Sequence, residues 1–249
     1  MAQGVTGIDV GGSSIKAGVV DVAAGRLCGE LISAATPQPS PPAALLAVIA
    51  ALAARLPEGA GAVGIALPSV VRRGIVHTAA NIDPAWIGTD GAALAARALG
   101  RPALLLNDAD AAGIAEMRFG SGRDCRGTVI MVTLGTGIGT ALFRDGRLFP
   151  NTELGHLELR GQDAEKWAAA QVRTREGLDF PAWIARVNEY LERLHALFWP
   201  DVFILGGAVS ERFAEFAPLL RSPAPLRPAH FAGQAGVVGA ALAAAAADG

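Results

Sequence analysis

The sequence has few cysteines, few lysines and no long apolar segment. Its two cysteines, Cys28 and Cys125, lie in different parts of the 249-residue chain, which excludes a disulfide framework and a CxxC metal knuckle. Glycine, proline or a charged residue interrupts every apolar run before it reaches the ~18 residues of a membrane span. The first residues lack the basic and apolar segments of a secretory signal. We therefore expect a cytoplasmic protein with no membrane partner.

Charge is also scarce and nearly balanced. Charged residues make up 18% of the chain and the net charge is −2, so no overall field favours nucleic acid or anionic lipid. Hydrophobic residues make up 51%, which excludes a disordered chain. Only Lys16 and Lys166 among the 21 basic residues are lysines, and Lys16 follows a glycine-rich turn. The length allows one large domain or two small ones.

Apolar periodicity alternates along the chain between strand-like and helix-like segments. The pattern predicts strands at residues 5–9, 15–20, 62–67, 103–106, 129–133, 138–143 and 202–205. It predicts helices at residues 43–56, 91–99, 107–117, 181–198 and 235–247. Such alternation is typical of an α/β fold.

Two segments of the chain share one pattern. Residues 4–27 and 128–148 each read strand, glycine-rich turn, strand, aspartate and then Gly-Arg-Leu. This repeated pattern indicates a duplication, and chance similarity between two hairpins is the alternative. A duplication predicts two lobes facing a cleft, with one glycine-rich hairpin from each. We place a small N-terminal lobe at residues 1–106 and a large lobe at residues 107–234, with a last helix (about 235–249) packing back on the first lobe.

The first glycine-rich turn combines a carboxylate, two glycines and one ammonium group. It reads Asp9-Val10-Gly11-Gly12-Ser13-Ser14-Ile15-Lys16. Glycines let backbone N–H groups approach a phosphate closely, and Lys16 can neutralise phosphate charge. Asp9 can hold Mg²⁺ through water. The turn is neither a Walker loop nor a dinucleotide fingerprint, and a plain β-hairpin is the alternative.

The second repeat carries another candidate phosphate-binding turn. It reads Leu134-Gly135-Thr136-Gly137-Ile138-Gly139, and a hairpin is again the alternative. Gly206-Gly207 follows the apolar strand at 202–205 and is a weaker third candidate. Two such turns in two repeats indicate phosphate binding more strongly than either turn alone.

Two polar motifs suit the chemistry of a hydroxyl-bearing substrate. Asn107-Asp108 follows an apolar strand, where α/β sheets hold ligands, and Asp108 can accept a proton from a hydroxyl. Helix capping is the alternative there. Glu153-Leu154-Gly155-His156 offers a carboxylate and an imidazole to sugar hydroxyls, and a solvated polar loop is the alternative. A zinc site is disfavoured because no cysteine or second histidine lies nearby.

Together these segments resemble the ROK sugar kinases (repressor, open reading frame, kinase), and within them the polyphosphate glucokinase branch. The resemblance follows family order over nearly the whole chain. It is carried by residues 7–16, 78–83, 86–90, 107–113, 133–139, 150–156, 163–166 and 235–239.

The resemblance implies an α/β, two-lobed actin/hexokinase-like fold, which is a duplicated ribonuclease H-like fold with central mixed sheets flanked by helices. It implies transfer of the terminal phosphoryl group of inorganic polyphosphate to the 6-hydroxyl of D-glucose, with Mg²⁺ as cofactor, and we expect a homodimer. Asp108 would be the catalytic base. The sugar would be held by Asn107, Asp108, Glu153, His156, Glu165 and Asn81. The candidates for the phosphoryl donor, from the turns and the resemblance together, are Asp9 (with Mg²⁺ through water), Gly11, Gly12, Ser13, Ser14, Lys16, Gly135, Thr136, Gly137, Gly206 and Gly207.

The chain departs from the branch at several places. Pro68-Ser69 stands where the branch usually has Pro-Gly, and Gly233-Gln234 stands where it usually has two asparagines. Lysines frequent in the branch after Ser210 are missing. The zinc-binding cysteines of many ROK proteins are absent after Gly155-His156, as in the polyphosphate branch. These changes bear on donor preference and catalytic strength more than on fold.

Other functions stay open at this point. An ATP-dependent or dual polyphosphate/ATP gluco(manno)kinase is the main alternative. A ROK transcription regulator would need a winged-helix segment before the first strand, which begins near Val5, and a sugar-binding pseudokinase conflicts with the retained Asn107-Asp108. If the donor is a long polyanion, arginines should extend its track, and the candidates by position are Arg72, Arg73, Arg144 and Arg147.

Overall fold

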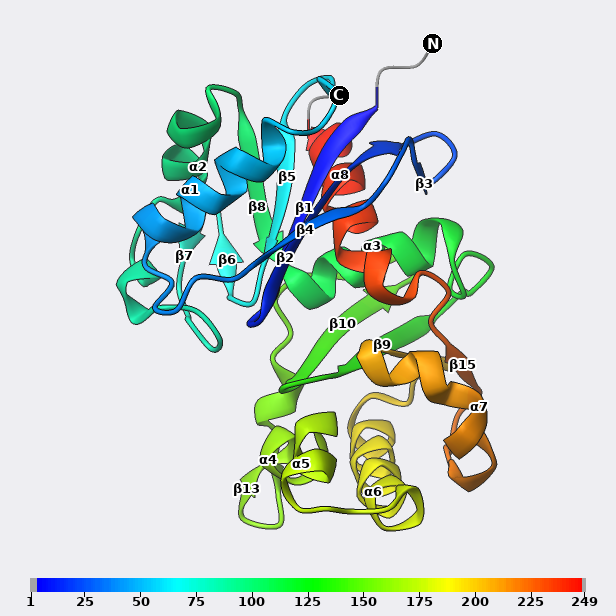
Figure 1. Cartoon of the computed structure of the whole chain (residues 1–249). Coiled ribbons are helices and arrows are strands. Elements are labelled where there is room, and N and C mark those ends of the chain that lie inside the picture. Colours follow the sequence, from blue (N-terminus) through cyan, green and yellow to red (C-terminus); the bar gives the residue numbers. More distant parts are fainter. Residues whose placement is uncertain (1–3, 248–249) are drawn as a thin grey trace. The chain divides into compact units, whose positions relative to one another are not determined.

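The chain forms two units, each built on one mixed β-sheet (Figure 1). The computed structural model describes residues 4–247. The expected small lobe and last helix include residues 1–3 and 248–249, which lie outside the described residues. The start of the chain, where we expect no signal sequence, falls mostly on residues 1–3. Unit 1 comprises residues up to Phe119 together with those from Gln234 onward, and unit 2 comprises Gly120–Gly233.

The sheet of unit 1 has the order β3-β2-β1-β5-β8, with β4 also paired to β2. Strands β1 and β2 form an antiparallel hairpin, whereas β1, β5 and β8 are parallel. The strands are β1 (Val5–Val10), β2 (Ser14–Asp21), β3 (Arg26–Leu27), β4 (Ile32–Ala35), β5 (Val63–Leu67) and β8 (Ala103–Asn107). A small separate hairpin consists of β6 (Val71–Arg72) and β7 (Ile75–Val76).

Side chains that alternate along β1 give the two faces of this sheet different partners. Ile8 and Val10 join a core that includes Leu45 and Ile49 of α1 (Pro42–Ala53), and α1 packs on α2 (Gly91–Leu99). Gly7 turns to the other face, where α8 (Ala235–Ala247) lies against β1 and β5 (Figure 1). A Cβ on Gly7 would strike the Val237 carbonyl, so glycine is what allows the helix this close approach.

The sheet of unit 2 has the order β11-β10-β9-β14-β15. It repeats the first plan, because β9 and β10 form an antiparallel hairpin and β14 is parallel to β9. The strands are β9 (Thr128–Leu134), β10 (Ile138–Arg144), β11 (Arg147–Phe149), β14 (Val202–Gly206) and β15 (Leu226–Pro228), and β12 (Glu158–Leu159) pairs with β13 (Gln162–Asp163) in a short hairpin.

Helix α6 (Phe180–Phe198) supplies much of the core of unit 2. Asp179 caps its N-terminus, since its Oδ1 accepts from Ala182 N at 2.8 Å. Trp183 and Tyr190 on its buried side pack in one cluster with Phe203 of β14. The remaining helices are α4 (Ala164–Ala168), α5 (Ala170–Arg175), α7 (Phe213–Phe216) and the 3₁₀ turns η1 (Pro84–Trp86), η2 (Leu154–His156), η3 (Ala208–Arg212), η4 (Ala217–Leu219) and η5 (Ala232–Gln234).

The observed architecture confirms the expected α/β class with mixed sheets flanked by helices, and it differs from the expected lobe limits by one helix. Helix α3 (Asp108–Phe119) belongs to unit 1, whereas the sequence analysis placed it in the second lobe. The reason is packing against α8, where Gly239 meets the Ala111 carbonyl so closely that no side chain fits between the two helices.

The predicted helix at 43–56 is also shorter, since α1 ends at Ala53. None of the helices between residues 4 and 247 combines the length and apolar character required to cross a bilayer.

Candidate active site

The first glycine-rich turn of unit 1 is held by hydrogen bonds to its carbonyl groups. Gly11 N donates to Ser14 O at 2.9 Å and closes the turn between β1 and β2. Thr36 Oγ1 donates to Gly11 O at 2.6 Å, and Gln38 Nε2 donates to Gly12 O at 3.1 Å. Within residues 4–247 the amides of Gly12 and Ser13 donate to no backbone carbonyl. The turn therefore fixes its carbonyls and keeps two N–H groups available to an anion.

Asp9 lies on β1 directly across from Lys16 on β2, so the strand register places the two side chains on the same face of the hairpin. The carboxylate of Asp9 also packs against Gly236 in the first turn of α8, where any Cβ would collide with it. Burial raises the pKa of Asp9 to about 6, and Lys16 partly opposes that rise. A buried carboxylate of this kind beside free amides fits a hydrated Mg²⁺, which is bound through one or two carboxylates plus phosphate oxygens.

Asn107 and Asp108 sit where β8 ends and α3 begins. Asn107 is buried, and its Oδ1 accepts from Asp110 N at 3.0 Å, so Asn107 supplies the helix cap. Its Nδ2 donates to Ser69 O at 3.3 Å. Asp108 is only partly buried, and its Oδ1 accepts from Ala109 N at 2.8 Å. Because Asn107 serves as the cap, Asp108 is not required for capping.

Two other residues of unit 1 lie beside these groups. Exposed Asn81 approaches the first turn, since a Cβ on Gly12 would be 3.5 Å from Asn81 Cβ. Ser69 occupies the loop after β5, next to Asn107, and its buried Oγ has no hydrogen-bond partner among the described residues. The structure thus brings Asn81 to the first glycine-rich turn. It places Ser69, which stands where the polyphosphate branch usually has glycine, next to Asn107.

The second glycine-rich turn, in unit 2, joins β9 to β10 and is fastened from two sides. Gln171 N at the start of α5 donates to Gly135 O at 3.0 Å. Gly207, with φ of 87°, packs against the backbone of Leu134. Gly137 lies so close to the Glu165 carboxylate that a side chain there would collide with it, while Thr136 at the tip is exposed. The structure therefore brings Gly207 to the Gly135-Thr136-Gly137 turn.

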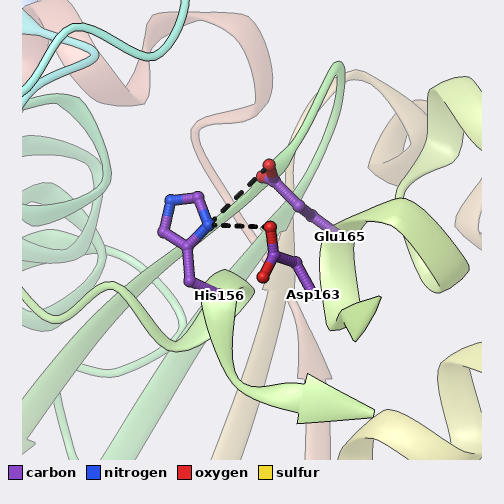
Figure 2. A group of neighbouring side chains, drawn as sticks. All are labelled: His156, Asp163 and Glu165. Carbon is purple, nitrogen blue, oxygen red and sulfur yellow. Dashed lines mark ion pairs between the residues drawn. The ribbon is translucent and has the colours of Figure 1, made fainter. Parts of the chain in front are cut away.

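Glu153, His156 and Glu165 also gather in unit 2, on η2 and α4. His156 Nε2 lies 3.8 Å from Glu153 Oε2, and His156 Nδ1 lies 4.0 Å from Glu165 Oε1. Glu165 Oε2 accepts from Ile138 N at 3.3 Å, which ties this group to the strand after the turn. Burial raises the pKa of Glu153, His156 lowers it and Glu165 raises it further. Figure 2 shows the His156 ring facing Glu165 and a third carboxylate, Asp163. The arrangement offers several directed donors and acceptors to a polyhydroxylated ligand.

The arginines expected along a donor track are not all near a glycine-rich turn. In the strand register Arg144 lies opposite Arg147 of β11 and Thr128 of β9. This is the end of the β9–β10 hairpin away from the second turn. At about 3.4 Å per residue along a strand, that end is about 20 Å from the turn. Arg72 and Arg73 lie at the β6–β7 hairpin of unit 1.

Arg173 and Asp163 are further candidates in unit 2 that the sequence motifs did not indicate. Arg173 on α5 is two residues from Gln171, whose N donates to Gly135 O, and its guanidinium lies 4.2 Å from the centre of the Phe180 ring. Its buried Nε has no hydrogen-bond partner among the described residues. The spacing of three residues between Asp163 and the rare Lys166 could have indicated an ion pair.

Comparison with known proteins places the chain in a family. The ROK family model matches residues 5–172. The chain belongs to the ROK family. A curated relative, the polyphosphate glucokinase of Mycobacterium tuberculosis (strain CDC 1551 / Oshkosh), is 44% identical over 238 residues, which cover 95% of this chain and 89% of that protein.

Solved structures of ROK proteins share the fold. The inorganic polyphosphate/ATP-glucomannokinase of Arthrobacter sp. strain KM superposes with a TM-score of 0.94 at 45% identity, covering 98% of this chain and 99% of that one. A ROK family glucokinase of Streptomyces griseus, solved with glucose and AMPPNP, superposes with a TM-score of 0.84 at 26% identity, covering 97% and 99%.

Proposed function

We propose that this ROK protein is a polyphosphate glucokinase, which transfers the terminal phosphoryl group of inorganic polyphosphate to the 6-hydroxyl of D-glucose. The products are glucose 6-phosphate and a polyphosphate shortened by one residue. The observation that carries the proposal is 44% identity to a curated polyphosphate glucokinase over 95% of the chain. The Asn107-Asp108 pair and the glycine-rich turn of each unit also support it.

Asp108 is the proposed base. As the glucose O6 attacks the terminal phosphorus, the O6–H proton passes to an Asp108 carboxylate oxygen and the bridging P–O bond breaks toward the remaining polyphosphate. Asn107 fixes the start of α3 and so the position of Asp108. Glu153, His156 and Glu165 are the proposed sugar ligands in unit 2, and Asn81, beside the first turn, is a further one in unit 1.

Each unit by itself carries proposed donor-binding groups. In unit 1 the amides of Gly12 and Ser13, the Ser14 strand start and Lys16 bind phosphate oxygens, and Asp9 holds Mg²⁺ through water. In unit 2 the corresponding groups are Gly135, Thr136 and Gly137, supported by Gly206 and Gly207. Mg²⁺ supplies neutralisation of the charge on the donor phosphates. We further propose that the enzyme is cytoplasmic and forms a homodimer.

A dual-donor enzyme is the second candidate. It is favoured by the similarity to the Arthrobacter protein, whose name includes both polyphosphate and ATP and both glucose and mannose. The Streptomyces coelicolor glucokinase is more distant, with 35% identity over 162 residues, or 61% of this chain.

A donor comparison tests the proposal. Purified protein, glucose and Mg²⁺ are assayed for glucose 6-phosphate with ATP, GTP and polyphosphates of graded length. Mannose is tested in parallel as the acceptor. We expect turnover with polyphosphate to exceed turnover with ATP. An ATP turnover equal to or above that with polyphosphate contradicts the main proposal and favours the second.

A further inference from the structure

Asp163 lies on the Nδ1 side of the His156 ring, and Lys166 forms an ion pair with Asp163. Asp163 Oδ2 lies 3.6 Å from His156 Nδ1, which is nearer than Glu165 and within the reach of an ion pair but longer than a hydrogen bond. Figure 2 shows the same ring nitrogen directed at both carboxylates. The other ring nitrogen, Nε2, faces Glu153. The ring therefore has two carboxylates on its Nδ1 side and one on its Nε2 side.

Local structure fixes Asp163 in this place. Strands β12 and β13 pair Glu158 with Asp163, and Ala164 N donates to Leu157 O at 2.9 Å, which closes the hairpin at the start of α4. Lys166, three residues on, places its Nζ 2.9 Å from the Asp163 oxygen that faces the ring. The hydrogen bond from Lys166 lowers the pKa of Asp163, so the carboxylate is ionised at neutral pH.

A negative charge beside Nδ1 favours the imidazole tautomer that carries its proton there. In that tautomer Nε2 has a lone pair and accepts a hydrogen bond. We propose that Asp163 and Lys166 are positioning residues of the sugar site: Lys166 fixes the Asp163 carboxylate, and this carboxylate holds His156 with its proton on Nδ1, so that Nε2 accepts from a glucose hydroxyl. The sugar part of this inference rests on the proposed function.

The same three groups, His156, Asp163 and Glu165, lie close enough to hold a metal ion. The ammonium of Lys166 already neutralises the Asp163 oxygen nearest the ring, and a divalent cation there would face that positive charge. The positive charge of Lys166 therefore disfavours a divalent cation beside this Asp163 oxygen.

Kinetics of four variants test the positioning role. Asp163→Asn removes the negative charge and Lys166→Met removes the positive charge. Lys166→Arg keeps a positive charge at position 166. Glu176→Gln is the matched control, because Glu176 is another carboxylate of unit 2 whose pKa basic neighbours lower. We expect Asp163→Asn and Lys166→Met to raise KM for glucose roughly 10-fold, with KM for polyphosphate unchanged, whereas Lys166→Arg and Glu176→Gln stay near the wild type. Equal rises in both KM values, or no rise in the glucose KM, would overturn the proposal.

A spectroscopic readout is independent of catalysis. The chain has four histidines, and ¹⁵N spectra of the ring nitrogens can be assigned to His156 with a His156→Gln variant. We expect the Nδ1–H tautomer in the wild type and a shift toward Nε2–H in Asp163→Asn. A wild-type Nε2–H tautomer, or Zn²⁺ displacing the His156 signals at stoichiometric concentration, would contradict the inference. If the tautomer behaves as expected but glucose is not phosphorylated, only the proposed function fails.

Discussion

At the scale of single residues, burial and neighbours give identical side chains opposite properties. Asp9 and Asp163 are both aspartates near a lysine, yet burial raises the pKa of Asp9 and a lysine hydrogen bond lowers that of Asp163. Asn107 and Asp108 are adjacent, yet one caps α3 from a buried position and the other is partly exposed. Residue type alone therefore determines neither the pKa of an aspartate nor the burial of a polar side chain.

The role of Asp108 is testable by removing its basicity. Asp108→Asn keeps the size of the side chain and an acceptor for Ala109 N but cannot take the proton. General-base catalysis contributes about 10²–10⁴-fold, so kcat should fall by that range while glucose still binds. Steady-state kinetics and calorimetric glucose binding measure both effects. Retention of most of the wild-type kcat would show that another group is the base.

The raised pKa of Asp9 predicts a pH-dependent cost to folding in the absence of Mg²⁺. Between about pH 4 and pH 6 the folded protein keeps a proton on Asp9 that the unfolded chain has released, so stability falls as pH rises. A pKa raised from 3.8 to about 6 corresponds to at most about 3 kcal/mol at pH 7. Asp9→Asn should therefore gain stability relative to wild type over this interval.

Urea unfolding without divalent cations at pH 4 and pH 7 measures this effect. Asp124→Asn is a suitable control because the Asp124 side chain is 78% exposed. Added Mg²⁺ should stabilise the wild type at pH 7 and not Asp9→Asn, since an ion that binds only the folded state shifts the unfolding equilibrium. An Asp9→Asn curve parallel to the wild-type curve between the two pH values would contradict the prediction.

At the scale of elements, helix α8 packs on one face of the sheet that carries the first glycine-rich turn. It meets β1 and β5 through close backbone contacts at Gly7 and Gly64, and its first turn meets the Asp9 carboxylate at Gly236. A helix N-terminus carries partial positive charge, which favours the carboxylate and a phosphate beside it. The end of the chain thus packs against the proposed donor-binding groups near its start.

Gly236→Ala should disturb this contact. The new Cβ would overlap the Asp9 carboxyl group, so either the carboxylate or the helix must shift. Forcing a methyl group into a packed position costs about 1–3 kcal/mol, and we expect a lower Tm and a higher requirement for Mg²⁺ and donor. Gly29→Ala, where a Cβ meets no atom within 4 Å, is the control. Unchanged donor kinetics in Gly236→Ala would separate α8 from the donor site.

The β9–β10 hairpin also makes a prediction, because its two ends are far apart. Arg144 lies at the end opposite the second glycine-rich turn, and Arg173 lies on the helix fastened to that turn. For short polyphosphates we expect Arg173→Gln to raise the donor KM several-fold and Arg144→Ala to leave it unchanged. Kinetics with graded chain lengths check this. The reverse ranking would place the donor along the far end of the hairpin.

At the scale of the whole molecule, two units repeat one plan, and each carries one glycine-rich hairpin with a parallel strand beside it. Net charge is small, so attraction of a long polyanion depends on local arginines and on Lys16 rather than on an overall field. Binding of a polyphosphate donor therefore depends on these charges, whereas binding of uncharged glucose does not.

Salt should therefore weaken the binding of the polyphosphate donor and leave the binding of the sugar unchanged. Exposed charge pairs are screened over about 8 Å at physiological ionic strength and further at higher salt. We expect the KM for long polyphosphate to rise steeply between low and high KCl, that for ATP to rise less, and that for glucose to stay nearly constant. Initial rates across a KCl series at fixed free Mg²⁺ measure the three trends. A polyphosphate KM insensitive to salt would contradict a track of exposed arginines.

The sequence by itself determined the α/β class, the two hairpins with glycine-rich turns and the order of the polar motifs. These follow from local periodicity and from glycine at positions where the backbone turns, and both are properties of neighbouring residues. The membership of α3 in unit 1 depended on its packing against α8, a contact between distant parts of the chain. The raised pKa of Asp9 and the approach of Asp163 to His156 were likewise decided by tertiary structure. They depend on burial, strand register and helix contacts, which join residues that no local pattern relates.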